Sequence, residues 1–230
     1  MKIVSIKNQL GKDIQRFLRL RIKNGYYIED THQLTETILD HKISLVGTTK
    51  DGKVIKLIRA RTWHEKLKLL WGKSRTHIEF YGASLLNEVG IRAPKVYELG
   101  IKLPWQNGSE FIGYYIMEDL RQADFQPIKP LIISNAINAH GKEIILHQLT
   151  KKLMTMKQQQ IIYGDLHFNN VFFNTQTKEL AFIDTGAKKV HSPSKFEKKF
   201  TQNIRKFCKG SARELFNKEQ IDQLTLNLEI

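Results

Sequence analysis

The chain has 230 residues, of which 41% are hydrophobic and 26% are charged, a composition typical of a folded globular protein and not of a disordered one. It contains 37 Lys and Arg against 23 Asp and Glu, and the net charge of +14 favours anionic partners such as phospholipid, nucleic acid or a phosphorylated compound. No apolar run approaches the roughly 18–20 residues of a transmembrane helix, and a single cysteine, Cys208, excludes an internal disulfide and a cysteine-rich metal site.

The start of the chain, Met1–Lys7, lacks a continuous apolar stretch followed by small residues, so the sequence predicts no signal peptide. There is no internal repeat, low-complexity tract or flexible linker. We therefore expect one continuous unit and a cytoplasmic location.

The first half of the chain is predicted to be rich in strands. Residues 43–46 and 54–58 are mainly apolar, with Ser44 and Lys56 as the polar exceptions, and flank Lys50-Asp51-Gly52. Asp-Gly readily supplies the positive φ of a tight turn, so this stretch predicts a β-hairpin.

A helix and a further strand follow the hairpin. Residues 75–89 are predicted to be helical, with Gly90 ending the helix, and residues 111–117 are predicted to form a buried strand. In the preceding segment Trp63 and Trp71 lie at helical spacing, and we expect them to fill a core.

The second half is predicted to be mainly helical. An amphipathic pattern over 144–156 indicates a helix, and residues 171–173 and 180–183 indicate two short strands. A basic helix is expected after Pro193. Strands that precede helices, with a division near residue 118, predict an α+β architecture of two lobes.

One polar segment and the hairpin after it contain the residues best suited to catalysis. Asp165 and Asn170 lie five residues apart, and Asp184 follows two apolar strands. Phosphoryl transfer needs a carboxylate that orients the acceptor hydroxyl and takes its proton, and oxygen ligands for magnesium. We predict Asp165 as the catalytic residue and Asn170 and Asp184 as ligands of Mg²⁺. His167 is expected to brace the loop instead of acting as the base.

This segment resembles the catalytic loop of kinase-like phosphotransferases, in which small-molecule kinases have His-Gly-Asp-Leu-His-x-x-Asn. Tyr163 stands where those proteins often have His. Ile183-Asp184-Thr185-Gly186 resembles their Asp-Phe-Gly, with Thr185 in place of Phe. The resemblance implies an ATP-dependent, Mg²⁺-dependent enzyme with a protein-kinase-like bilobal fold, in which residues 1–118 form a small, mostly β lobe and 119–230 a larger, mostly helical lobe.

The resemblance also implies a lysine that holds the α- and β-phosphates of ATP and a glutamate that orients it. Lys56, on the second strand of the predicted hairpin, is the preferred lysine, with Lys53 as the alternative. Glu79 is the preferred glutamate, with Glu88 on the same predicted helix as its competitor.

Two further parts of the nucleotide site are expected near these residues. Met117 and Glu118 resemble the Met-Glu hinge of related kinases, whose backbone groups bind adenine. A glycine-rich phosphate loop is not recognisable, and Gly47 is interpreted as its remnant.

The best overall resemblance is to bacterial kinases of the lipopolysaccharide inner core, which phosphorylate Kdo or heptose. It covers roughly Ser44 to Lys189 and depends on the stretch 57–75, the segment Gly90–Pro94 and the loop around Asp165. Membership would imply a glycolipid acceptor, with a sugar hydroxyl presented at the cytoplasmic face of the inner membrane.

A basic segment near the C-terminus fits a peripheral contact with that anionic membrane. Between Lys195 and Arg213, apolar residues lie at helical spacing among basic ones. A basic amphipathic helix can lie on anionic lipid. The alternative is that its Phe stripe packs into the protein core while its lysines are solvated.

Other functions are also compatible with parts of the sequence. The acceptor could be an aminoglycoside, a choline-like compound or a protein, although a chain at +14 disfavours polycationic aminoglycosides. A protein kinase would need an activation segment, and no Ala-Pro-Glu follows Asp184. A non-enzymatic pseudokinase or basic binding module is the remaining alternative. The chain has no helix-turn-helix, zinc-finger or RNA-binding signature, which argues against nucleic acid as a partner.

Overall fold

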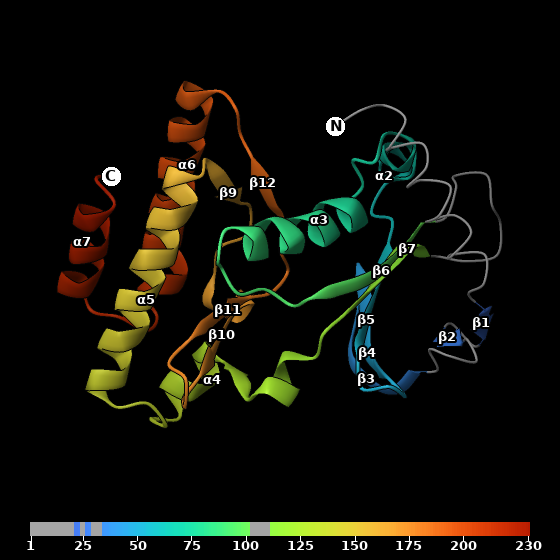
Figure 1. Ribbon diagram of the computed structural model, residues 1–230, viewed down its shortest axis with the longest axis horizontal. Coiled ribbons are helices and arrows are strands. Elements are labelled where there is room, and N and C mark those ends of the chain that lie inside the picture. The colour runs from blue at the N-terminus through green and yellow to red at the C-terminus, as the bar shows by residue number, and fades with distance from the viewer. Residues whose placement is uncertain (1–20, 24–25, 29–33, 102–110) are drawn as a thin grey trace. The chain divides into compact units, whose positions relative to one another are not determined.

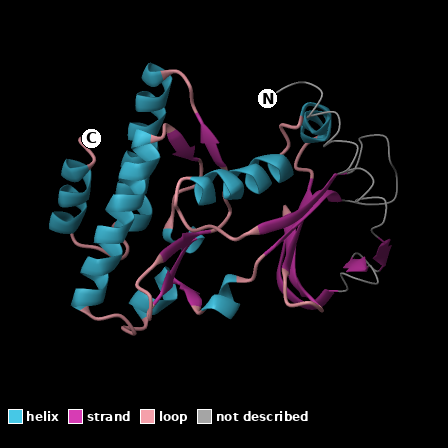
Figure 2. Ribbon diagram, viewed as in Figure 1, coloured by secondary structure: helices cyan, strands magenta, loops and turns pink. Residues whose placement is uncertain are grey.

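The computed structural model describes residues 21–23, 26–28, 34–101 and 111–230 (Figure 1). The chain groups into two compact units. Unit 1 comprises Met1–Phe80 and Lys95–Asp119, and unit 2 comprises Tyr81–Pro94 and Leu120–Ile230. The mixed α+β class predicted from the sequence is confirmed, with the larger sheet in unit 1 and most helices in unit 2 (Figure 2).

Unit 1 is built on a five-stranded antiparallel sheet with the strand order β3-β4-β5-β7-β6. The strands of this sheet are β3 (Leu34–His41), β4 (Ser44–Thr49), β5 (Val54–Arg59), β6 (Val96–Ile101) and β7 (Phe111–Met117). A separate antiparallel pair consists of β1 (Arg21–Lys23) and β2 (Tyr26–Ile28). The predicted hairpin is confirmed as β4–β5, and Gly52 in its turn has a φ of +73°.

The central strands β5 and β7 are covered on both faces, which explains their continuous apolar sequences. One cluster, which includes Leu57 and Tyr114, covers one face, and a second cluster, which includes Ile58 and Tyr115, covers the other. The edge strand β3 is largely exposed and has a mixed polar sequence that gave no clear strand signal.

Three helical elements follow the hairpin. They are α2 (Trp63–Lys68), the 3-10 turn η1 (Leu69–Trp71) and α3 (Arg75–Glu88). The expectation that the two tryptophans fill a core is wrong, because Trp63 is 62% exposed and Trp71 is 60% exposed. The short α2 buries none of its residues, and Leu69 enters the core instead.

Unit 2 contains most of the helices and two small antiparallel sheets, β11-β10-β8 and β12-β9. Its helical elements are η2 (Leu120–Ala123), α4 (Ile128–Ile133), α5 (Ala139–Gln158), η3 (Phe168–Asn170), α6 (Pro193–Phe207), the π-helical turn η4 (Cys208–Ala212) and α7 (Lys218–Asn227). Its strands are β8 (Phe125–Pro127), β9 (Ile161–Tyr163), β10 (Val171–Asn174), β11 (Leu180–Phe182) and β12 (Ala187–Lys189). The predicted helix before residue 156, the two strands after Asn170 and the helix after Pro193 are therefore present.

The apolar stripe of α6 packs inside unit 2. Its buried residues are Phe196, Phe200, Ile204 and Phe207. The ring of Phe207 lies 5.0 Å from that of Phe168, which follows the predicted catalytic residue closely in sequence. The structure thus decides between the two interpretations of this stripe in favour of core packing. Within the described residues, no helix combines the length and apolar character needed to cross a membrane.

The expected division at residue 118 needs a correction for residues 81–94, which group with unit 2. Two hydrogen bonds to residues of this segment explain the grouping. Phe182 N on β11 donates to Arg92 O at 2.8 Å, and Lys152 Nζ on α5 donates to Gly90 O at 2.9 Å. The segment after α3 is therefore held by elements of unit 2.

Candidate functional site

A buried ion pair in unit 1 joins Lys56 on β5 to Glu79 on α3. The Nζ atom of Lys56 lies 2.8 Å from Oε2 of Glu79. Both residues are buried, at 8% and 6% exposure. Burying two charges costs free energy that their attraction only partly offsets, so such a pair is weak support for a purely stabilising role.

The two alternative residues lie in different surroundings. Lys53 is partly exposed and pairs with Asp51 in the β4–β5 turn. Glu88 is exposed at the end of α3 and belongs to unit 2. The structure therefore brings Lys56 together with Glu79 and leaves Lys53 and Glu88 apart from that pair.

Two residues that the sequence did not single out complete the cluster around Glu79. The hydroxyl of Tyr115 donates to Oε2 of Glu79 at 2.8 Å, and Nε of Arg75 lies 3.6 Å from Oε1. Tyr115 is the direct neighbour of Lys56 on the adjacent strand β7, so both side chains point to the same face of the sheet. The register between β5 and β7 would have been needed to find Tyr115 from the sequence.

The predicted hinge residues lie at the end of β7. Glu118 N donates to Lys95 O at 2.8 Å, and Lys95 N donates to Oε2 of Glu118 at 3.0 Å. Because the N–H of Glu118 is engaged in this way, any contact of Met117 and Glu118 with an adenine ring would have to use other backbone groups.

The interpretation of Gly47 as the remnant of a phosphate loop is wrong. Gly47 lies inside β4, and the turn between β3 and β4 contains Lys42 and Ile43. A Cβ atom at position 47 would come within 2.3 Å of Leu34 Cδ2 and 2.5 Å of Glu36 O. The glycine is required for the close approach of β3.

In unit 2, the predicted catalytic segment forms the loop between β9 and β10. The side chain of Asp165 is 64% exposed, and its Oδ2 lies 3.3 Å from Nε2 of His167. Asn170 is 5% exposed, and its Nδ2 lies 3.1 Å from both Asp165 O and Nε2 of His167. His167 therefore contacts both Asp165 and Asn170, as expected of a residue that braces the loop.

Asp184 is held next to this loop by backbone hydrogen bonds on both sides of it. Ile183 N donates to Asn170 O at 2.9 Å, and Gly164 N donates to Gly186 O at 3.2 Å. The hydroxyl of Tyr163 donates to Ile183 O. Thus Tyr163 holds the turn that contains Asp184.

Asp184 itself has a φ of +55°, in the left-handed region that non-glycine residues rarely adopt. Aspartate tolerates this conformation better than most residues. Backbone strain of this kind concentrates at functional sites, where the surrounding structure enforces it.

The donor atoms near Asp184 fit a hard cation. Because a carbonyl oxygen only accepts, the atom of Asn170 that faces Asp165 O must be the amide nitrogen. Within the described part of the chain, Oδ1 of Asn170 makes no hydrogen bond. One amide oxygen and one carboxylate match the way Mg²⁺ is held, since this ion takes few protein ligands and completes its shell with phosphates and water. No cluster of three or more His, Cys, Asp or Glu suited to a metal occurs among the described residues.

Three further residues support the loop and were not identified from the sequence. A Cβ atom on Gly82 of α3 would lie 1.8 Å from Thr185 O, so the helix and the Asp184 turn touch through their backbones. Asn203 of α6 donates from Nδ2 to Tyr163 O at 3.0 Å, and Ser211 Oγ accepts from Phe168 N at 2.8 Å. A glycine inside a predicted helix was the only sequence signal among these.

The chain matches no protein-family model, and no curated protein sequence is significantly similar to it. The interpretation of the site therefore depends on the chemistry and geometry of its own residues.

Proposed function

We propose that this protein is an ATP-dependent and Mg²⁺-dependent kinase with a bilobal, protein-kinase-like fold. Unit 1 would be the small lobe, which holds the phosphates, and unit 2 the larger lobe, which contains the catalytic loop. The acceptor would be a sugar hydroxyl of the lipopolysaccharide inner core, on Kdo or heptose.

The observation that carries the proposal is the arrangement of Asp165, Asn170 and Asp184. These side chains come from a loop and a turn that are joined by the hydrogen bonds of Gly164, Asn170 and Tyr163. They combine an exposed carboxylate, an amide oxygen without a hydrogen bond and a second carboxylate, as phosphoryl transfer requires. The buried Lys56–Glu79 pair in unit 1 is a second and independent support.

In the proposed reaction, each residue has a distinct task. Lys56, oriented by Glu79, would bind the α- and β-phosphates of ATP. Asn170 and Asp184 would hold Mg²⁺, which neutralises charge on the phosphates when bound. Asp165 would orient the acceptor hydroxyl and accept its proton. A bond forms between the acceptor oxygen and the γ-phosphorus, the bond to the bridging oxygen breaks, and ADP leaves.

The class of acceptor is inferred from the resemblance of the segments around Asp165 and Gly90–Pro94 to core-sugar kinases and from the net charge of +14. A basic protein attracts an acidic glycolipid and repels a polycationic aminoglycoside. The two parts of the proposal can fail separately, because the phosphotransfer chemistry does not depend on the identity of the acceptor.

The test is transfer of label from γ-labelled ATP in the presence of Mg²⁺. The purified protein is given lipid A with Kdo or heptose, and in parallel a soluble aminoglycoside and a generic protein. We expect label on the glycolipid, and we expect Asp165→Asn to lower its turnover by about 10²- to 10⁴-fold, because the variant cannot accept the hydroxyl proton.

Asp222→Asn is the matched control, since it removes one exposed carboxylate from α7 in the same unit. It should keep full activity. Asp165→Asn with the turnover of the unaltered protein would refute the kinase proposal. Label on the aminoglycoside or the protein alone would refute the core-sugar acceptor and leave the phosphotransferase in place.

A further inference from the structure

The exposed side of α6 and the segments next to it in sequence are rich in basic residues. From Lys188 to Arg213 the chain has nine Lys and Arg and one acidic residue, Glu197. All nine basic side chains are exposed. Among the described residues, none of the nine forms an ion pair with a carboxylate, so their charge is not neutralised within the protein.

The buried apolar stripe of α6 explains why the basic side chains of this helix face solvent. Phe196, Phe200 and Phe207 fix the inner face of α6. With 100° per residue, Lys198 and Arg205 fall about 160° and about 140° from Phe200 around the helix axis, on the side away from the buried stripe. The 15 residues of α6 extend over about 22 Å at a rise of about 1.5 Å per residue.

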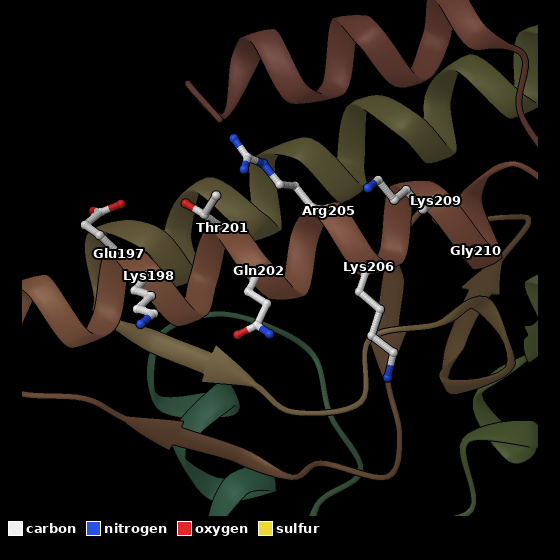
Figure 3. A pocket seen from close by; sticks show the side chains of 8 residues that line it. All are labelled: Glu197, Lys198, Thr201, Gln202, Arg205, Lys206, Lys209 and Gly210. Carbon is white, nitrogen blue, oxygen red and sulfur yellow. The ribbon is translucent and has the colours of Figure 1, made fainter.

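A shallow, open hollow runs along this outer face of α6 (Figure 3). Lys198 and Lys206 extend from one edge of the helix, and Arg205 and Lys209 extend from the other. The hollow therefore has two cations on each side, and Glu197 is its one acidic residue. Cations spread along the helix in this way suit an extended anionic surface better than a single small anion.

We infer that this outer face of α6 docks the protein on an anionic phospholipid bilayer. Because the Phe stripe is buried in unit 2, the contact is electrostatic and places no apolar side chain in the lipid. In such a contact, each basic residue near the surface strengthens binding roughly 5-fold. The inference depends on surface charge alone and holds whether or not the kinase proposal does.

Two features favour a bilayer over nucleic acid as the occupant. Seven of the nine basic residues are Lys, which acts as a point charge, whereas Arg is the usual choice for two-pronged recognition of phosphates and bases. The aromatic residues of α6 are all buried, so the helix offers no ring on which a base could stack.

The inner side of the same helix contacts the catalytic loop, through Asn203 at Tyr163 O and, just beyond the helix, Ser211 at Phe168 N. The docking face and the loop are thus parts of one packed body, unit 2. Docking would hold the catalytic loop at a fixed distance from the membrane surface.

The test is co-sedimentation of the full chain with vesicles of phosphatidylcholine alone or mixed with phosphatidylglycerol. We expect binding only to the mixed vesicles, and loss of binding as salt rises from about 0.1 M to about 1 M, because the Debye length falls from about 10 Å to about 3 Å. The variant Lys198→Gln/Lys206→Gln/Lys209→Gln should bind roughly 100-fold more weakly.

The matched control is Lys151→Gln/Lys178→Gln/Lys218→Gln, which removes the same charge from exposed positions elsewhere in unit 2. It should bind like the unaltered protein, as should Asp165→Asn, which separates docking from catalysis. Circular dichroism checks that each variant is folded. Equal binding of the two triple variants, or equal binding to both kinds of vesicle, would overturn the inference.

Competition identifies the source of the phosphate groups. Inorganic phosphate at the concentration of the lipid phosphate should not displace the protein from mixed vesicles. Displacement by inorganic phosphate would indicate a site for a single anion, and complete displacement by RNA at equal phosphate would indicate a nucleic-acid surface. Either result would overturn the proposed membrane contact.

Discussion

The carboxylate of Glu79 accepts a hydrogen bond from Tyr115 and contacts two cationic side chains, Lys56 and Arg75. Each of these contacts restricts the position of the Glu79 carboxylate. The carboxylate in turn restricts the position of the Lys56 ammonium group. A flexible lysine on its own would place its ammonium group poorly. In the proposed kinase, Tyr115 and Arg75 are therefore positioning residues that act through Glu79.

Replacement of Tyr115 by Phe tests this arrangement, since it removes only the hydroxyl. We expect the free energy of unfolding to fall by about 1–3 kcal/mol, because the bond is to a charged, buried group. In the proposed kinase, KM for ATP should rise more than kcat falls, since Lys56 contacts the nucleotide.

Urea unfolding and steady-state kinetics measure the two effects. Tyr97→Phe is the control, because Tyr97 lies on β6 of the same unit and is 43% exposed. If the Tyr115 and Tyr97 variants lost equal stability and bound ATP alike, the role assigned to Tyr115 would be wrong.

Among the secondary-structure elements, α3 shows how a single position can fix a distant turn. Its glycine at position 82 faces the backbone of the turn after Asp184, and the space there is smaller than a methyl group needs. Helix propensity favours Ala over Gly by about 1 kcal/mol in a helix interior. A glycine at this point is therefore explained by packing and not by local preference.

Gly82→Ala should accordingly destabilise the protein by about 1–3 kcal/mol, since the new methyl group must displace backbone atoms of Thr185 and Ala187. Because the displaced turn contains Asp184, turnover in the transfer assay should fall as well. Thermal unfolding and that assay are the measurements.

Gly210→Ala is the matched control, because a Cβ at position 210 meets no atom within 4 Å. It should be as stable as the unaltered protein or slightly more so. A Gly82 variant with the stability and activity of the Gly210 variant would show that the turn is free to move.

For the molecule as a whole, the one cysteine links stability to pH. Cys208 is buried at the end of α6, and burial raises the pKa of its thiol from an ordinary value of 9.0 to about 11. The folded state therefore holds the thiol proton more tightly than the unfolded chain does. Its stabilising contribution is fully present below about pH 9 and is lost as the pH rises through about 11.

Comparison with Cys208→Ala isolates this contribution from the many lysines that titrate in the same range. We expect the stability advantage of the unaltered protein over the variant to be constant up to about pH 9 and to shrink as the pH rises towards about 11. Urea unfolding at a series of pH values measures the difference. An advantage that stays the same at every pH would contradict the burial of the thiol.

Features that depend on residues close together in the chain could be predicted from the amino-acid sequence. The β4–β5 hairpin, the helices α3 and α6 and the strands β10 and β11 follow from periodicity and turn residues, which act over a few positions. The loop of Asp165 and Asn170 was likewise recognisable, because the spacing of its polar groups is local.

Which side chains meet, and which helix and sheet faces are covered, depends on the tertiary structure. The contacts of Glu79 with Tyr115 and of Gly82 with Thr185 join distant segments, and they depend on strand register and helix packing. A periodic pattern shows that a helix has an apolar side but not what covers that side. The periodic pattern of α6 therefore left open whether its Phe stripe is buried, and the structure shows that it is. The spacing of Trp63 likewise led to the expectation of a core position, whereas the side chain is exposed.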